Sequence, residues 1–116
     1  MNILIVEDEK ALSHALELKL VHEGFTVVAV SNGQECLDAV QNQQFDVILL
    51  DLIMPVMDGF QVLERLRQLP QMPAVFVLSN LSQHEDETRA MALGARKFFI
   101  KSNTPLVTIV EEVKKV

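Results

Sequence analysis

The sequence contains very little cysteine, and this limits the kinds of protein it can be. Cys36 is the single cysteine among 116 residues, so an internal disulfide is excluded. It has no other Cys or His at the spacing of a metal site. Such a chain is typical of a reducing compartment, so we expect it in the cytoplasm, with Cys36 packed as a small hydrophobe in a helix.

Long hydrophobic runs and positive charge are also scarce. The longest apolar run is far shorter than a membrane span, and Glu7 and Asp8 follow Met1 too closely for a signal peptide. Ten Lys and Arg stand against sixteen Asp and Glu, which gives a formal net charge of −6. This sign is wrong for holding a phosphate backbone, so we expect neither membrane association nor direct nucleic-acid binding.

The residues that are present suffice for one folded domain. Hydrophobic residues make up 49% of the chain and charged residues 22%, so a packed core is expected rather than disorder. A length of 116 residues is close to that of one compact domain and leaves no room for a second core. Residues 1–116 are therefore predicted to form a single domain.

Five short apolar runs rich in β-branched residues alternate with segments of helical spacing. The runs are nearly continuous in hydrophobicity, which is typical of strands buried on both faces. They cover residues 3–6, 25–30, 46–50, 74–78 and 97–100. Repeated strand, helix, strand units require right-handed crossovers and a parallel sheet covered on both sides. The sequence therefore predicts a doubly wound α/β fold.

Residues typical of helix ends agree with this alternation. Ser82 begins a predicted capping box. Thr104 and Pro105 predict the N-cap and first residue of a last helix that runs to the end of the chain. Gly24 and Gly94 stand where two earlier helices should stop.

Charged and polar residues stand at the carboxyl ends of the predicted strands. They are Glu7, Asp8 and Glu9 after the first, Asp51 after the third, Ser79 and Asn80 after the fourth, and Lys101 after the fifth. In a doubly wound sheet the ligand site gathers outside these ends, where the strand order reverses. Glu7, Asp8 and Asp51 are therefore expected to converge.

A cluster of three carboxylates needs cations. Two like charges about 4 Å apart repel by about 1 kcal/mol in water and by about 4 kcal/mol at an effective dielectric near 20. Lys101 can offset one charge, and a hard divalent ion with oxygen ligands, Mg²⁺, would offset the rest. The same parts suit phosphoryl transfer, with Asp51 as the nucleophile and Mg²⁺ between Asp8, Asp51 and the phosphoryl group. Lys101 and Ser79 would then contact the remaining phosphoryl oxygens.

Motifs at these positions span the whole chain. They are Glu7-Asp8, the stretch Asp-Leu-Ile-Met-Pro-Val-Met-Asp-Gly at 51–59, Ser79, Gly94-Ala95 and Lys101. In this combination the sequence resembles the response-regulator receiver family of two-component phosphorelay systems. The resemblance implies a flavodoxin-like fold with strand order 2-1-3-4-5 and five helices.

The resemblance also implies a role for each site residue. Asp51 is the phosphoacceptor, which takes its phosphoryl group from a sensor histidine kinase or a histidine phosphotransfer protein in a reaction that needs Mg²⁺. Asp8 is a direct metal ligand, Glu7 acts largely through water, and the backbone carbonyl of Ile53 is a further ligand. The domain is then no ordinary enzyme, because it catalyses only its own phosphorylation and dephosphorylation.

A switch is implied as well. Ser79 and Phe98 are expected to move together on phosphorylation and to change the face built from the fourth helix, fifth strand and fifth helix, about residues 85–116. This face would signal to an output domain or protein. A second copy of the chain, in a homodimer formed on phosphorylation, is a further expected partner. From the residues alone, Phe98 is a half-buried strand aromatic.

Two residues depart from the family pattern. Ser102 stands where a proline usually follows the lysine through a cis bond, and a cis bond without proline costs about 2.5–4 kcal/mol. We therefore expect a trans bond after Lys101. Asn80 replaces a small alanine, so access to the phosphoryl group and the rates of transfer and hydrolysis are expected to differ.

Several other residues are expected to have structural roles. Pro55 should shape the loop after the acceptor, Gly59 should adopt a backbone angle that other residues resist, and Asp58 should cap the next helix. The three histidines are expected on helix surfaces away from the strand ends: His14, His22 and His84.

Three other functions fit parts of the pattern. A phosphatase of the haloacid dehalogenase type also forms an aspartyl phosphate, but its Asp-x-Asp motif after the first strand is not supplied by Glu7-Asp8-Glu9. A flavin carrier would need hydroxyls and glycine in that loop to hold phosphate. The third alternative is a degenerate receiver used only as an interaction module, which phosphorylation of Asp51 would rule out.

Overall fold

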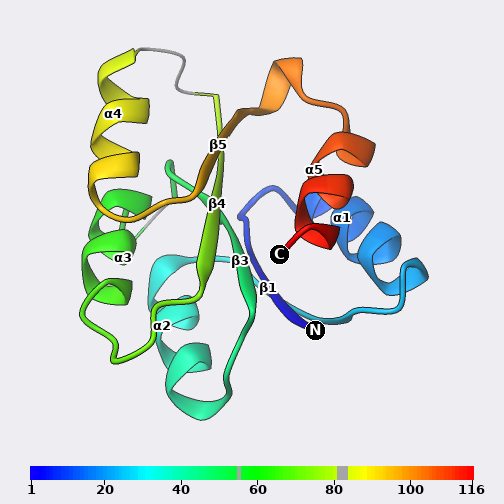
Figure 1. The fold of residues 1–116 in the computed structure, drawn as a ribbon, viewed down its shortest axis with the longest axis horizontal. Coiled ribbons are helices and arrows are strands. Elements are labelled where there is room, and N and C mark those ends of the chain that lie inside the picture. The colour runs from blue at the N-terminus through cyan, green and yellow to red at the C-terminus, as the bar shows by residue number, and fades with distance from the viewer. Residues whose placement is uncertain (55, 81–83) are drawn as a thin grey trace.

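The computed structural model describes residues 1–54, 56–80 and 84–116 (Figure 1). Strands and α-helices alternate along the chain. The strands are β1 (Asn2–Val6), β2 (Thr26–Val30), β3 (Val47–Asp51), β4 (Ala74–Ser79) and β5 (Lys97–Ile100). The helices are α1 (Lys10–His22), α2 (Gly33–Asn42), α3 (Gly59–Leu66), α4 (His84–Ala92) and α5 (Leu106–Lys114), with a 3₁₀ turn at Lys101–Asn103. Each strand agrees with its predicted range within about one residue at either end.

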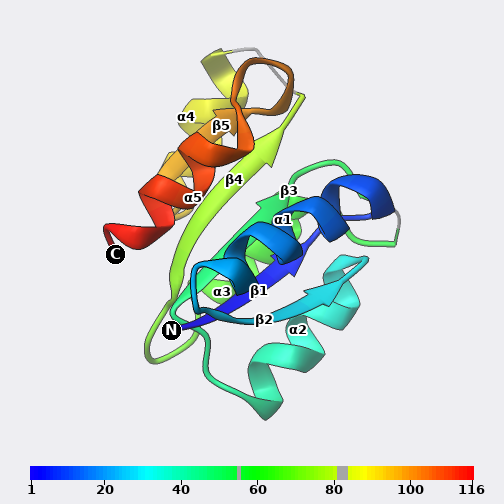
Figure 2. The same ribbon diagram turned by 90° about the vertical axis from the view of Figure 1, so that its right-hand side faces the viewer.

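All five strands form one parallel sheet in the order β2-β1-β3-β4-β5, which confirms the predicted doubly wound fold. Helices α2, α3 and α4 cover one face, and α1 and α5 cover the other (Figures 1 and 2). The strand order reverses at β1 and β3, so the carboxyl ends of these two strands lie side by side. Ligand sites in such sheets form at this point.

Hydrophobic side chains form a separate cluster on each face of the sheet. The central strands alternate between the two clusters: Leu4 and Val6 belong to one, and Ile3 and Ile5 to the other. The prediction that every strand is buried on both faces is wrong for β2 and β5, where Thr26, Ala29 and Lys97 are exposed. The reason is that an edge strand has a neighbour on one side only.

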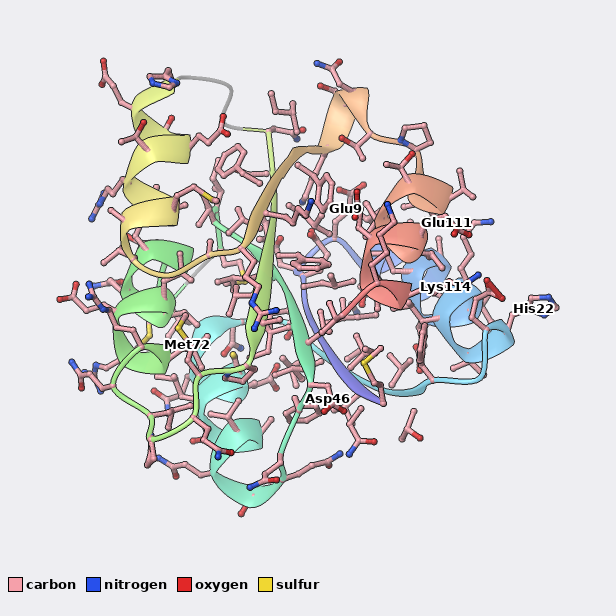
Figure 3. All side chains as sticks on the ribbon, viewed as in Figure 1. Glu9, His22, Asp46, Met72, Glu111 and Lys114 are labelled. Carbon is pink, nitrogen blue, oxygen red and sulfur yellow. The ribbon has the colours of Figure 1, made fainter. Side chains whose placement is uncertain are left out.

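An ion pair connects the two helices that cover the second cluster. Lys114 of α5 donates a hydrogen bond to Glu23, just after α1, over 3.0 Å, and Figure 3 shows Lys114 beside α1. Both side chains are partly exposed, so the pair contributes little to stability. Among the described helices, none has the length and apolar character that a membrane crossing requires.

The predicted helix stops are confirmed, but the predicted start of the last helix is wrong. Gly24 and Gly94 follow α1 and α4 with φ of 94° and 105°, which favours glycine. Helix α5 begins at Leu106, because Pro105 is still extended at ψ 148° and the hydroxyl of Thr104 donates to the carbonyl of Ile100 over 2.9 Å. The capping prediction for Ser82 and the loop prediction for Pro55 fall outside the described residues.

Candidate functional site

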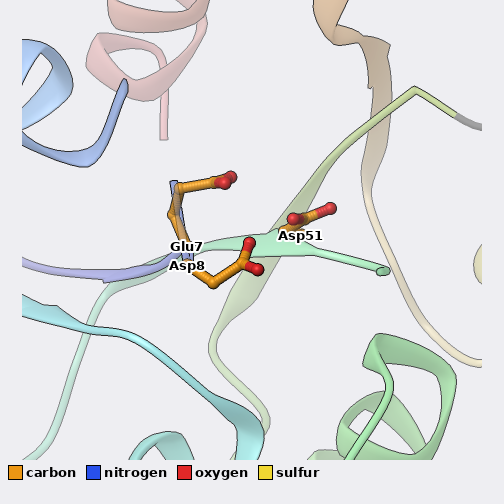
Figure 4. Close-up of side chains that lie close together, drawn as sticks. All are labelled: Glu7, Asp8 and Asp51. Carbon is orange, nitrogen blue, oxygen red and sulfur yellow. The ribbon is translucent and has the colours of Figure 1, made fainter. Parts of the chain in front are cut away.

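Three carboxylates meet at the reversal of strand order (Figure 4). Glu7 and Asp8 directly follow β1, and Asp51 is the last residue of the neighbouring strand β3. One oxygen from each carboxylate lies within 4.8 Å of the others. The predicted convergence is confirmed, and it follows from the parallel register of β1 and β3.

Two of these carboxylates are buried. Glu7 is 3% exposed and Asp51 is 4% exposed, whereas Asp8 is exposed. Burial is the main reason that the pKa of Glu7 lies above its ordinary value, and the charge of Asp51 raises it further. Burial likewise raises the pKa of Asp51, and Asp8 adds to this effect. The ionised carboxylates are therefore destabilised by burial and by mutual repulsion, and a bound cation would offset both effects.

Lys101 supplies one such cation. It begins the 3₁₀ turn straight after β5, and its amine donates to Glu7 Oε1 over 2.9 Å and to Asp51 Oδ2 over 3.2 Å. Burial on its own would lower the pKa of Lys101, but the two carboxylates outweigh burial and raise it. The amine is therefore charged, and it lies in the acidic cluster as predicted.

The residues present also fit a divalent metal ion. Glu7 Oε2 lies 2.7 Å from the Lys101 amine as an ion pair, yet within the described chain it is a buried oxygen without a hydrogen bond. Three carboxylates and one ammonium leave a formal charge of −2 when all are ionised, because −3 + 1 = −2. An all-oxygen donor set with this charge suits a hard cation such as Mg²⁺.

The backbone after Asp51 helps to hold the carboxylate of this residue in place. The amide of Ile53 donates to Asp51 Oδ1 over 3.2 Å, while the Lys101 amine contacts Oδ2. Each oxygen of the carboxylate therefore has its own donor. The part predicted for the Ile53 carbonyl, as a metal ligand, stays a prediction.

Gly59 is required for a different reason from the one predicted. Its φ is not positive among the described residues, so the expected unusual backbone angle is wrong. A Cβ at this position would lie 2.5 Å from the Cα of Leu52 and 2.6 Å from the carbonyl oxygen of Asp51. The residue before it, Asp58, forms a capping box with Gln61, which confirms its predicted role as a helix cap.

Ser79 and Phe98 lie on the two strands beyond the acceptor. Ser79 ends β4 and is fully buried, and Phe98 of β5 is partly buried against the cluster under α2, α3 and α4. Asn80, which follows Ser79, is exposed. The structure thus places Ser79 on β4, next to the strand that ends at Asp51, and Phe98 on β5, which is part of the face formed by α4, β5 and α5. The movement of both residues stays a prediction.

The peptide bonds of the described residues are all trans, so the bond between Lys101 and Ser102 is trans as predicted. The three histidines lie on helix surfaces, also as predicted: His14, His22 and His84. His14 lies closer to the site than predicted, because it lines a surface hollow of about 360 Å³ together with Glu7.

One contact at the site has no counterpart in the sequence pattern. The backbone amide of Glu9 donates to Glu7 Oε1 over 3.1 Å, which helps to orient this buried carboxylate. Every non-proline residue has a backbone amide, so the side-chain identity of residue 9 could not predict this hydrogen bond.

Comparisons with known proteins match these features. Residues 3–113 match the response regulator receiver domain family. The cell cycle response regulator CtrA of Brucella ovis is 35% identical over 101 residues, which cover 87% of this chain and 44% of that protein. The chain thus spans less than half the length of the curated relatives it matches.

Solved structures agree in fold. Chemotaxis protein CheY4 of Vibrio cholerae has a TM-score of 0.91 at 26% identity, over 99% of this chain and 97% of that chain. The signal receiver domain of a histidine kinase from Syntrophus aciditrophicus has a TM-score of 0.87 at 31% identity, over 98% and 87%. With nearly its whole length matched, the chain belongs to the response regulator receiver domain family of two-component signalling.

Proposed function

We propose that this receiver domain accepts a phosphoryl group on Asp51 in a reaction that needs Mg²⁺. One observation carries the proposal: the buried Asp51 carboxylate lies 3.2 Å from the Lys101 amine and within 4.8 Å of two further carboxylates. Phosphoryl transfer requires a positioned nucleophile and positive charge around the phosphoryl oxygens. These residues supply the nucleophile, one cation and the ligands for a second.

In the proposed reaction, an oxygen of Asp51 attacks the phosphorus of the donor. The new O–P bond forms as the donor's bond to phosphorus breaks, and the imidazole of phosphohistidine or the acetate of acetyl phosphate leaves with the electron pair of that bond. The Lys101 amine pairs with one phosphoryl oxygen, and the Ser79 hydroxyl donates to another. Hydrolysis of the aspartyl phosphate by water then restores Asp51.

Asp8, Asp51, Glu7 and the Ile53 carbonyl are the proposed ligands of the metal ion, with Glu7 acting largely through water. When bound, Mg²⁺ supplies positive charge that offsets both the carboxylates and the phosphoryl oxygens. Lys101 would then exchange part of its contact with Glu7 for a contact with a phosphoryl oxygen.

The proposed output is a change in the face formed by α4, β5 and α5. Ser79 and Phe98 would shift together, because β4 and β5 lead directly into these elements and two discrete packings amplify a small movement. The proposed partners are a histidine kinase or histidine phosphotransfer protein on the input side. An output domain, an output protein or a second copy of the chain would take up the signal.

We further propose that residues 1–116 form one domain that works in the cytoplasm. The free thiol of Cys36 supports this compartment, because reduced cysteines are typical of it. The domain would be a phosphoacceptor that acts on itself and not an enzyme with an outside substrate.

Intact-mass measurement after incubation with acetyl phosphate and Mg²⁺ tests the proposal. The wild-type protein should gain one phosphoryl group, and Asp51→Asn should gain none. Amide exchange with and without beryllofluoride then tests the output face, where protection should change in 84–116. A wild-type protein that stays unmodified at saturating donor, or a modification at another residue, would favour the interaction module instead.

A further inference from the structure

A contact outside the site joins the third and fourth helices. The guanidinium carbon of Arg89, on α4, lies 4.1 Å from the centroid of the Phe60 ring, on α3. This distance is well within the range of a cation–π interaction. Phe60 is 7% exposed, whereas Arg89 is exposed, so the guanidinium covers the outer side of a buried ring.

Phe60 is fixed to the backbone of the acceptor. It directly follows Gly59, whose amide donates to the carbonyl of Leu52 over 2.9 Å. A Cβ on Gly59 would lie only 2.6 Å from the carbonyl oxygen of Asp51, so the start of α3 is in close contact with the end of β3. The Phe60 ring therefore belongs to a helix whose first turn packs directly against residues 51–52.

Helix α4 packs against β5 but buries few of its own side chains. Among its nine residues, Ala90 is the one that is buried, and an alanine contributes only a methyl group to the core. The guanidinium of the preceding residue, Arg89, adds the contact with Phe60. This contact therefore joins the exposed side of α4 to α3.

Arg89 also has a second partner within reach of its own helix. Glu85 lies four residues earlier, a spacing at which Glu and Arg form ion pairs on a helix. In residues 84–116 the two form no ion pair, because Arg89 points to Phe60 instead. The spacing thus offers Arg89 a second arrangement, an ion pair with Glu85 that would leave α4 without its tie to α3.

We propose that Arg89 is a positioning residue whose contact with Phe60 holds α4 in its unphosphorylated packing and so opposes the switch of the output face. The proposal rests on the proposed function, because it concerns the regulation of that same site. Loss of the contact favours the switched packing, and any ligand that binds this packing better must bind more tightly as a result.

The expected size of the effect follows from the strength of the contact. A cation–π interaction at an exposed site changes a two-state equilibrium constant by about two- to fivefold. By linkage, the apparent affinity of a phosphoryl mimic should change by up to the same factor.

The test measures the affinity for beryllofluoride in the presence of Mg²⁺, by titration of amide signals in NMR spectra. Arg89→Gln should bind about two- to fivefold more tightly than wild type, and amides in 84–92 should exchange faster without ligand. Arg65→Gln is the matched control, because Arg65 is an exposed arginine of α3, and it should match wild type. In a Phe60→Leu background, Arg89→Gln should have no further effect, since the ring is already absent.

The outcomes separate the two proposals. If the wild-type protein does not bind beryllofluoride, the proposed function itself is wrong. If wild type binds it and Arg89→Gln binds equally or more weakly, the role of Arg89 is wrong and the proposed function stands. An equal effect of Arg89→Gln with and without the Phe60 ring would also overturn the positioning role.

Discussion

At the scale of single residues, the site combines a buried carboxylate, Asp51, with the cation of Lys101 that contacts it. The Lys101 amine contacts both Glu7 and Asp51, so one side chain offsets part of the negative charge of the site. Asp8 differs from both carboxylates because it is exposed and has no part in these contacts among the described residues. Asp8 is therefore the carboxylate most accessible to a metal ion.

Asp8→Asn should slow phosphorylation by weakening metal binding and leave the nucleophile intact. We expect the Mg²⁺ concentration for half-maximal rate to rise about tenfold, since a charged ligand is lost. Intact-mass rates measured over a range of Mg²⁺ with acetyl phosphate check this, and high Mg²⁺ should recover part of the rate. Asp51→Asn is the control, and no Mg²⁺ concentration should restore its phosphorylation.

Asp51→Asn should also stabilise the metal-free protein at pH 7. Burial raises the pKa of Asp51 in the folded protein above its value of 3.8 in the unfolded chain. The Asp51 carboxyl therefore contributes to stability at pH values below 3.8, and this contribution is lost as the pH rises through the folded pKa. At pH 7 the charge therefore opposes folding, and its removal should add on the order of 1 kcal/mol to the free energy of unfolding. Urea unfolding at pH 7 and pH 4 checks this, and a gain that is no larger at pH 7 contradicts it.

At the scale of elements, the start of α3 lies in close contact with the backbone at the site. Gly59 contacts the backbone of residues 51 and 52 so closely that any side chain must displace it. The Asp58 cap then fixes where this helix begins. The position of Asp51 thus depends on a helix that contributes no side chain to the carboxylate cluster.

Gly59→Ala should lower both stability and the rate of phosphorylation. The added methyl group overlaps the Leu52 Cα and the Asp51 carbonyl, so the backbone must shift, at a cost of about 1–3 kcal/mol. Gly24→Ala is the control, because its φ of 94° strains an alanine while the space around it is open and far from Asp51. Thermal unfolding and intact-mass rates check both, and only Gly59→Ala should slow phosphorylation.

The elements also show what the sequence could and could not predict. The convergence of Glu7, Asp8 and Asp51 was predictable, because residues at the carboxyl ends of adjacent parallel strands must meet. The role of Gly59 was not predictable, because a close approach depends on how the helices pack. A glycine in the sequence does not show whether it is needed for lack of space or for a positive φ. Thr104 was misplaced as a cap because its hydroxyl has a competing partner in the Ile100 carbonyl.

At the scale of the whole molecule, two hydrophobic clusters sandwich the sheet, and Cys36 lies within the one under α2, α3 and α4. Its side chain is fully buried, and burial raises the pKa of the thiol to about 12. The reactive thiolate is thus almost absent near neutral pH unless this part of the molecule opens.

The native protein should therefore resist alkylation of Cys36 by iodoacetamide at pH 8, whereas the protein in urea should react readily. The matched control is Gln41→Cys in a Cys36→Ala background, which places a thiol on the exposed side of the same helix. Mass spectrometry of the labelled protein measures both rates. Equal labelling of the two native proteins would contradict the buried, inert thiol.

The order in which the site residues occur along the chain has a consequence for synthesis. Lys101 contacts Glu7 across 94 positions and Asp51 across 50, so the acidic residues leave the ribosome long before their cation does. A nascent chain that ends before β5 contains Asp51 but lacks Lys101. The proposed acceptor and its lysine thus come together only when the last strand has been made, and a truncated translation product that lacks this strand carries Asp51 without Lys101.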